Sequence, residues 1–150
     1  MTKSENKGRA EKKRVSLNDR VLRVDERDKN NFYLQGSKCE CCRNVYFPQR
    51  MICPKCGRDD TVKPVPLSKN GKLYSFTVIR RQSLCPPGFS APYSFGYVDL
   101  SEGARVLSLL EGELDLLVPG VEMELALRRV GEDQNGNEIV WYSFIPRSRS

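Results

Sequence analysis

Two pairs of cysteines are the residues of this sequence best suited to chemistry. Cys39 and Cys42 are separated by two residues, as are Cys53 and Cys56, and ten residues lie between the pairs. A C-x2-C turn points two thiolates toward one centre, and four thiolates are a ligand set that tetrahedral Zn²⁺ prefers. The spacing therefore predicts one zinc ion held by these four residues. Because four sulfur ligands leave no open position for a substrate, we expect this metal to be structural rather than catalytic.

Other uses of the sulfur atoms are less favoured. A redox-active pair is typical of a thioredoxin-like βαβ pattern, which is not present here. A disulfide framework is disfavoured because we expect a cytoplasmic chain: there is no secretory signal and no apolar stretch long enough to cross a bilayer. Cys41 could replace Cys42 as a ligand, although a C-x-C turn is the poorer one. Cys85 is expected to be an ordinary small apolar residue.

The sequence contains no histidine. This excludes a Ser-His or Cys-His nucleophile pair, an imidazole general base and a histidine metal ligand. Any metal in this chain must therefore be held by sulfur or carboxylate ligands. Gly57 follows the second cysteine pair, where such a turn often needs a positive φ, and Arg43 stands at the equivalent place after the first. The left-handed conformation would cost Arg43 roughly 1–2 kcal/mol.

Strand-like segments follow the cysteines. They are rich in aromatic and β-branched residues or alternate in polarity, and Gly- and Pro-containing turns separate them. They cover residues 72–80, 93–100, 105–110, 121–130 and 138–145. Five short strands without a helix between them predict a mostly β protein with a small closed barrel, because closure removes exposed strand edges. An OB-type barrel is the first candidate and an SH3-like barrel the alternative.

The chain divides into five expected segments. Residues 1–14 hold six basic and two acidic side chains, and we expect a disordered tail there. Residues 15–36 have apolar residues spaced as on one helical face, with Ser16 as a possible N-cap, although a short strand over residues 21–24 is the alternative. We expect the zinc ribbon over residues 37–60, the barrel over residues 61–146 and a tail over residues 147–150.

With these elements in order, the sequence resembles the DUF35 family, in which a rubredoxin-like zinc ribbon precedes an OB-fold. The family's C-x2-CG, aromatic, "P-R" and CP-x-CG steps are similar to residues 39–57. Its "G-x-vysyTvv" strand is similar to residues 71–79, and its "P-y-x-x-a-x-V-d-L-x-e-G-x-r-v-l-s" segment to residues 92–108. The "iG-x-x-V" turn is similar to residues 119–121. The departures are Arg43 in place of glycine, the additional Cys41 and the inserted Gln49.

The resemblance implies a non-catalytic partner of a thiolase-fold protein. In this picture the barrel docks on the partner subunit, and the ribbon shapes or covers an acyl-CoA site used for thiolytic or retro-aldol C–C cleavage. The candidate residues for contact with the partner or the acyl site lie in and after a proline-rich loop: Leu84, Pro86, Phe89 and Tyr93. The alternative is a nucleic-acid-binding zinc-ribbon and OB protein, since the formal charge is +6, but basic residues are sparse among the strand aromatics.

Overall fold

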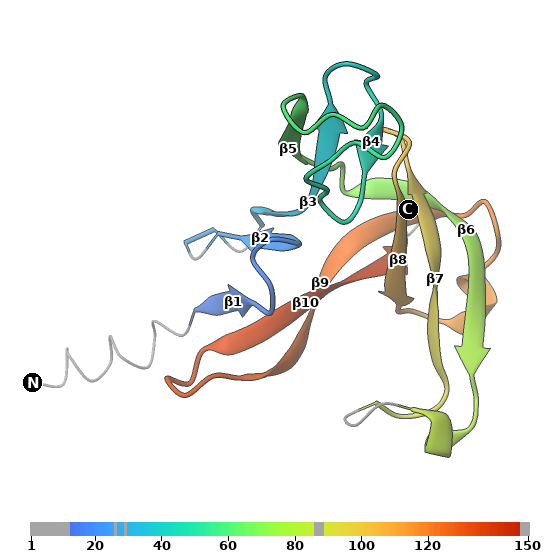
Figure 1. Ribbon diagram of the computed structural model, residues 1–150. Helices are drawn as coiled ribbons and strands as arrows, with labels where there is room; N and C mark the ends of the chain where they lie inside the picture. Colours follow the sequence, from blue (N-terminus) through green and yellow to red (C-terminus); the bar gives the residue numbers. More distant parts are fainter. Residues whose placement is uncertain (1–12, 26, 29, 86–88, 148–150) are drawn as a thin grey trace, which may run out of the picture.

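The computed structural model describes residues 13–25, 27–28, 30–85 and 89–147 (Figure 1). Its larger sheet contains β6 (Asn70–Ile79), β7 (Tyr93–Leu100), β8 (Arg105–Leu110), β9 (Glu122–Glu132) and β10 (Glu138–Pro146). Antiparallel pairing joins β6 to β7, β7 to β8, β9 to β10 and β6 to β9, and a parallel pair joins β8 to β10. The five strands thus close into a ring in the order β6-β7-β8-β10-β9. The predicted mostly β architecture with an OB-type barrel is confirmed.

Alternation of side chains explains why these segments form the barrel. In β7, Ser94, Gly96, Val98 and Leu100 are buried and point inward, while the residues between them point outward. Gly96 is required at its place because a Cβ there would collide with the carbonyl oxygen of Ser75 on β6. The strand boundaries expected for β7 and β8 agree with the structure, since both strands lie between clear turn signals. The short 3₁₀ helices η1 (Gln82–Leu84) and η2 (Leu114–Leu116) lie in connections between strands.

A smaller sheet carries the cysteines. β3 (Phe32–Cys39) is its centre and pairs antiparallel with β2 (Leu22–Val24), β4 (Val45–Tyr46) and β5 (Val62–Pro66). Figure 1 shows β3, β4 and β5 at one end of the barrel. We expected the zinc ribbon to end at residue 60, but β5 begins after that residue and pairs with β3. The sheet of the ribbon therefore extends further along the chain than the cysteine pattern indicated.

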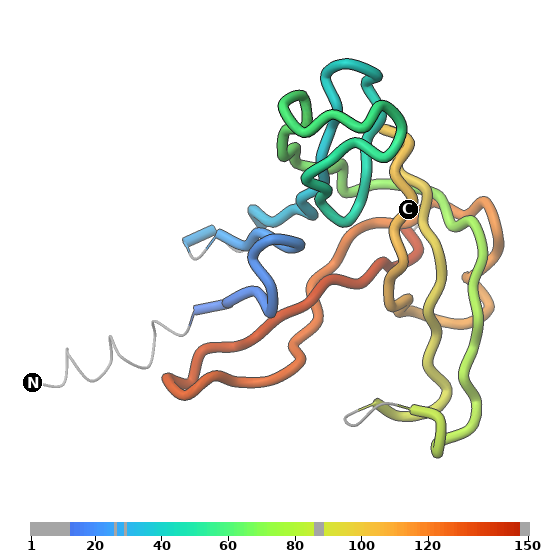
Figure 2. Tube along the Cα trace, viewed as in Figure 1, coloured from blue at the N-terminus to red at the C-terminus, as the bar shows by residue number. Residues whose placement is uncertain are grey.

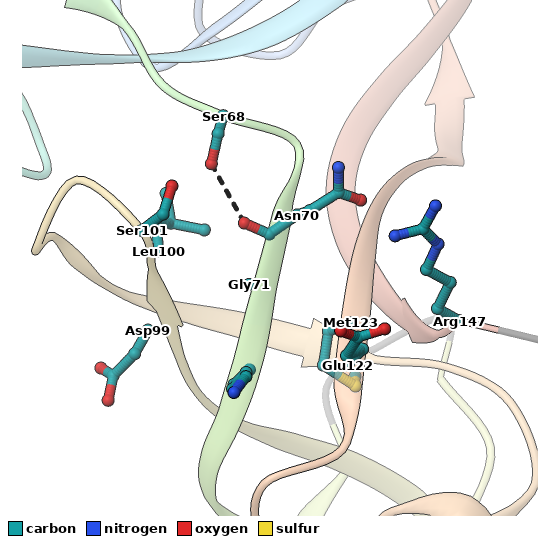
Figure 3. A pocket seen from close by; sticks show the side chains of 10 residues that line it. Ser68, Asn70, Gly71, Asp99, Leu100, Ser101, Glu122, Met123 and Arg147 are labelled. Atoms are coloured by element: carbon teal, nitrogen blue, oxygen red, sulfur yellow. Dashed lines mark hydrogen bonds between the residues drawn. The ribbon is translucent and has the colours of Figure 1, made fainter.

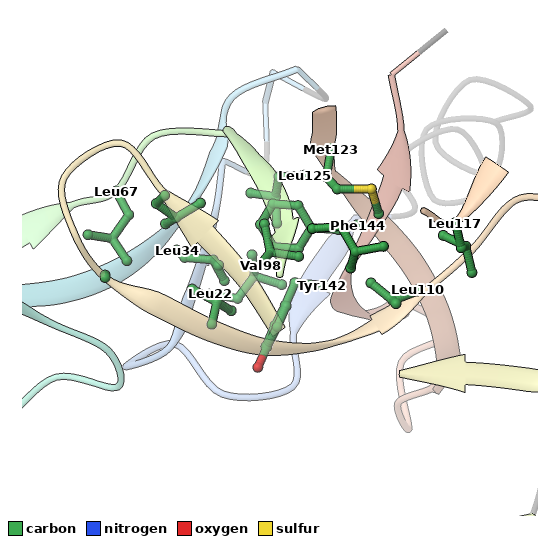
Figure 4. Packing of buried hydrophobic residues seen from close by; sticks show 14 of the residues in the cluster. Leu22, Leu34, Leu67, Val98, Leu110, Leu117, Met123, Leu125, Tyr142 and Phe144 are labelled. Atoms are coloured by element: carbon green, nitrogen blue, oxygen red, sulfur yellow. The ribbon is translucent and has the colours of Figure 1, made fainter. Parts of the chain in front are cut away.

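One apolar core joins the two sheets. Leu22 and Leu34 from the smaller sheet, and Leu67 from the connection to β6, belong to the same cluster as the barrel residues Val98 and Phe144 (Figure 4). Leu22, Leu34, Val98 and Phe144 have no exposed surface. Because the cluster is continuous, the position of the ribbon on the barrel is set by packing and not only by the chain connection.

The helix considered for residues 15–36 is wrong. This segment instead forms β1 (Arg14–Ser16), β2 and the beginning of β3. Leu22 pairs with Leu34 across β2 and β3, so sheet pairing rather than a helical face buries the apolar residues. The alternative of a short strand over residues 21–24 is the one that the structure supports.

The two ends of the chain differ from the expected tails. Arg14 belongs to β1, which lies parallel to β10 and beside the hairpin that β9 and β10 form away from the barrel (Figure 2). Arg147 donates its backbone N–H to the carbonyl oxygen of Glu122 at 2.8 Å. The remaining parts of both predicted tails, residues 1–12 and 148–150, lie outside the described residues. Within the described part of the chain, no helix has the length and apolarity that crossing a membrane requires.

Candidate metal centre

The two cysteine pairs sit in two turns of the same geometry. In the first turn Arg43 N–H donates to the Cys39 carbonyl at 2.6 Å, and Cys39 N–H donates to the Asn44 carbonyl at 3.0 Å. In the second turn Gly57 N–H donates to the Cys53 carbonyl at 2.8 Å, and Cys53 N–H donates to the Arg58 carbonyl at 2.9 Å. Each turn therefore fixes its two cysteine side chains on the same side of the backbone.

The four sulfur atoms converge. Cys39 Sγ lies 3.5 Å from Cys56 Sγ, and Cys42 Sγ lies 3.5 Å from Cys53 Sγ. All four sulfur atoms lie within 4.8 Å of one another. A tetrahedral site with metal–sulfur bonds of about 2.3 Å places its sulfur atoms about 3.8 Å apart, so the arrangement fits such an ion. These four cysteines could hold a metal ion, as the spacing predicted.

Two hydroxyl groups favour the ionised form of the buried thiols. Tyr46 Oη lies 3.5 Å from Cys53 Sγ and lowers the pKa of that thiol to about 6, against the opposing effect of burial. Thr61 Oγ1 lies 3.3 Å from Cys39 Sγ and lowers the pKa of Cys39. The sequence analysis predicted neither contact. Thr61 comes beside the cluster only through the pairing of β5 with β3.

The other two thiols have raised pKa values. At Cys56 the Arg58 backbone amide favours the thiolate, but burial and the sulfur atoms of Cys39 and Cys53 outweigh it and raise the pKa of Cys56 to about 12. The pKa of Cys42 is also raised: the Asn44 amide opposes the rise, while burial and the neighbouring sulfur atoms cause it. Repulsion among four adjacent thiolates disfavours their joint ionisation, and a bound dication would supply the compensating positive charge.

Arg58 is one of several basic residues beside the ligands. Its guanidinium forms two hydrogen bonds of 3.1 Å with the Asp60 carboxylate, and this ion pair is the largest cause of its raised pKa. Its charge also interacts with the thiols of Cys41 and Cys56. The positive charge of Arg58 beside the ligands is therefore partly balanced by the Asp60 carboxylate.

The two remaining cysteines lie outside the sulfur cluster. Cys41 is exposed and is not among the four converging residues. Cys85 donates its thiol to the backbone oxygen of Arg81 at 3.7 Å. The sequence contains no histidine that could act as a general base toward either thiol.

The loop residues considered for partner contact are only partly brought together. The rings of Phe89 and Tyr93 lie 5.6 Å apart, and the guanidinium of Arg128 lies 4.5 Å from the centre of the Phe89 ring. Leu84 is on η1 with 62% of its surface exposed. Pro86 lies outside the described residues. The structure shows that Phe89 and Tyr93 form a pair on the barrel, and their functional role stays a prediction.

A hollow of about 490 Å³ lies where β6, β7 and β9 meet. Figure 3 shows that Asp99 and Arg147, two of its charged lining residues, lie on opposite sides of β6. Asp99 is already bound to Arg105 through contacts of 2.6 and 3.1 Å. Ser68, which lines the hollow, donates its hydroxyl to the Glu102 carboxylate at 2.9 Å and to the Asn70 carbonyl at 3.0 Å.

Comparison with known proteins agrees with this geometry. The family model described as "ChsH2, C-terminal OB-fold domain" matches residues 64–128. A DUF35 domain-containing scaffold protein of Methanocaldococcus jannaschii is 34% identical over 130 residues, which cover 84% of this chain and 90% of that protein. The benzoylsuccinyl-CoA thiolase subunit BbsA of Thauera aromatica is 37% identical over 112 residues, which cover 75% of each chain.

A solved structure leads to the same family. The Ltp2-ChsH2(DUF35) aldolase matches with a TM-score of 0.62 and 26% sequence identity, over 76% of this chain and 84% of the matched chain. Fold, cysteine cluster and relatives therefore agree over most of the sequence, and this chain belongs to the DUF35 family.

Proposed function

We propose that this chain is a non-catalytic subunit that docks on a thiolase-fold protein and supports the conversion of a CoA thioester. The observation that carries the proposal is its 37% identity, over 75% of both chains, to a protein named as a subunit of benzoylsuccinyl-CoA thiolase. The similarity to the DUF35 component of an aldolase extends the reaction class from thiolytic to retro-aldol C–C cleavage. The partner supplies the nucleophile, and this chain shapes or covers the acyl-CoA site.

The proposed metal is one structural Zn²⁺ bound by Cys39, Cys42, Cys53 and Cys56. All-sulfur coordination suits Zn²⁺ and leaves no site for a substrate oxygen. Two buried ligands, Cys39 and Cys53, would fasten the ends of the ribbon loops to β3 and to the segment before β5. The metal would thereby stabilise the ribbon in the position where the shared core holds it on the barrel.

Part of the proline-rich loop would contact the partner or line the acyl site. Leu84 is well placed for this role because it is exposed at the turn of η1. Phe89 and Tyr93 present adjacent rings at the barrel end of the same loop. We include Pro86 on sequence grounds alone, and we place the complex in the cytoplasm.

Nucleic-acid binding is less well supported. It requires free cations among stacking aromatic side chains. Arg105 is bound to Asp99, and Arg128 is bound to Glu111 at 3.2 Å, so the arginines next to the barrel aromatics already have carboxylate partners.

The proposal is tested by isolating the tagged chain from its native cells and identifying the proteins that purify with it. We expect a thiolase-fold protein in a fixed ratio, and C–C cleavage of an acyl-CoA by the two purified subunits together but not by this chain alone. Turnover of a CoA thioester by the isolated chain, or a salt-sensitive complex with nucleic acid in place of a protein partner, would contradict the proposal.

A further inference from the structure

The barrel carries apolar side chains on part of its outer surface. The register places these residues on the outward side of three neighbouring strands, where β7 faces β8 and β8 faces β10. We call this set the apolar face: Tyr93, Phe95 and Tyr97 on β7, Leu107 and Leu109 on β8, and Trp141 on β10. A shallow hollow of about 220 Å³ in its middle is lined by five of these six residues, all but Tyr97, together with Ser108 and Tyr142.

The strands beside this face carry several polar or small residues on their outward side. Ser75 and Thr77 on β6 face Tyr97 and Phe95 directly across the strand pair, and both are exposed. On β9 the residues opposite Ser143 and Trp141 are Ala126 and Arg128. On β6 the apolar residues Tyr74 and Ile79 lie at the two ends of this polar stretch, and Ile79 is directly opposite Tyr93.

Strands that are apolar on both sides are typical of sheets covered on both sides. The inner side of β7 and β8 is already covered by the barrel core, which buries Val98, Leu100, Val106 and Leu110. On the outer side Tyr97 keeps 42% and Leu107 keeps 48% of its surface exposed, although they lie opposite each other. A contiguous exposed apolar surface of this kind marks an interaction site in a folded protein.

The chemistry of the face favours a protein as its occupant. None of its six residues is charged, so it cannot neutralise the phosphates of a nucleic acid. At its border Arg105 is held by Asp99 and lies with its guanidinium 3.6 Å from the centre of the Tyr74 ring, so this cation is already satisfied. Uncharged aromatic and aliphatic residues surrounded by polar groups are the usual composition of the centre of a protein interface.

The face is also continuous with the loop expected to contact the partner. The Phe89 ring lies 5.6 Å from the Tyr93 ring, which in turn lies 6.1 Å from the Phe95 ring. These three rings form a row from the end of the proline-rich loop onto the sheet. A subunit that contacts the loop would therefore meet the apolar face next to it.

We propose that the apolar face is the surface on which the catalytic subunit docks, through an uncharged and largely apolar surface of its own. This inference rests on the proposed function, and it places the centre of the interface on β7, β8 and β10 instead of on the zinc ribbon or the proline-rich loop. The exposed pair formed by Tyr97 and Leu107 is the centre of this contact.

The test uses the whole metal-loaded chain and the separately expressed catalytic subunit that purifies with it. Leu107→Glu and the milder Tyr97→Ala change outward side chains, and Gln134→Glu in the exposed turn between β9 and β10 is the control outside the apolar face. Zinc content and the circular dichroism spectrum establish that each variant is folded. Calorimetric titration should show at least about tenfold weaker binding for both face variants, as expected for central interface residues, and less than about twofold change for the control.

Three other outcomes would overturn the proposed docking surface. If folded Leu107→Glu and Tyr97→Ala bind the catalytic subunit as tightly as the wild type, the docking surface lies elsewhere while the proposed function stands. If the wild-type chain alone is a dimer that Leu107→Glu dissociates, the face joins two copies of this chain and the proposal is overturned. If the wild-type chain binds no acyl-CoA enzyme at all, the proposed function fails, and this inference fails with it.

Discussion

Arg43 and Gly57 occupy the same position in the two cysteine turns. Each follows the second cysteine of its pair, each donates its backbone N–H to the carbonyl of the first cysteine, and each has a positive φ, 64° for Arg43 and 73° for Gly57. The left-handed conformation is easily reached by glycine and is unfavourable for an arginine. The first turn therefore stores backbone strain that the second turn avoids.

This difference predicts opposite effects of two substitutions on stability. Gly57→Ala should lower the free energy of unfolding by about 1 kcal/mol, because a Cβ there meets no atom within 4 Å and only the backbone conformation is penalised. Arg43→Gly should raise the stability by up to about 1 kcal/mol for the converse reason. Thermal unfolding of the metal-loaded protein measures both, with shifts of about 2–4 °C expected for a chain of this size. An unchanged midpoint in Gly57→Ala would contradict this account.

The sulfur cluster predicts a metal content that depends on particular cysteines. Elemental analysis should find about one zinc ion per wild-type chain. Cys53→Ser should lose the metal and unfold the ribbon, because metal binding and folding are coupled at such sites. Cys41→Ser is the matched control and should retain both metal and fold, since Cys41 lies outside the cluster. A metal-free wild-type chain with a fully folded ribbon would exclude the site.

The Tyr46 hydroxyl predicts a pH dependence of metal retention. Because this group lowers the pKa of Cys53 to about 6, its removal in Tyr46→Phe should raise that pKa and let protons compete better with the metal. We expect the variant to release zinc at a higher pH than the wild type during acidification, and to bind it about tenfold more weakly at neutral pH. A chromogenic zinc indicator follows the release. Tyr33→Phe is the control, and identical release curves for the wild type and Tyr46→Phe would contradict the prediction.

A second pH effect is expected in alkaline solution. Burial raises the pKa of Tyr142 to about 12, and its hydroxyl donates to the Leu107 carbonyl at 2.8 Å. A raised pKa in the folded state means that this group stabilises the fold fully below about pH 10, the ordinary tyrosine pKa, and that the contribution is lost as the pH rises toward 12. The pKa of Tyr46 is also raised to about 12 by its contact with Cys53, so tyrosinate absorbance should show two late-titrating groups, of which Tyr142→Phe removes one. Ionisation of all tyrosines near pH 10, with the fold intact, would refute this.

Local sequence patterns were enough to predict the cysteine site and most strands of the barrel. The two C-x2-C pairs predict the four converging sulfur atoms because each turn is a short-range structure formed within a few residues. β7 and β8 could be predicted with their boundaries because turn residues on both sides limit them and their side chains alternate in the expected way.

Residues whose environment depends on distant parts of the chain could not be predicted in this way. The spacing of Leu17, Val21 and Val24 favoured a helix, but Leu22 is buried through its pairing with Leu34, which lies twelve positions later. Thr61 reaches Cys39 only because β5 pairs with β3. No local property of residues 15–36 or 61–66 indicates these partners.

By itself, the sequence determined that four thiolates would face one another and that five alternating strands would follow. Both results depend on the geometry of neighbouring residues along the chain. Only the tertiary structure decided that the ribbon shares a core with the barrel and that the outer side of β7 and β8 remains partly exposed. The reason is physical: alternation shows that a strand has two sides, but the elements packed against each side determine which of them stays open to a partner.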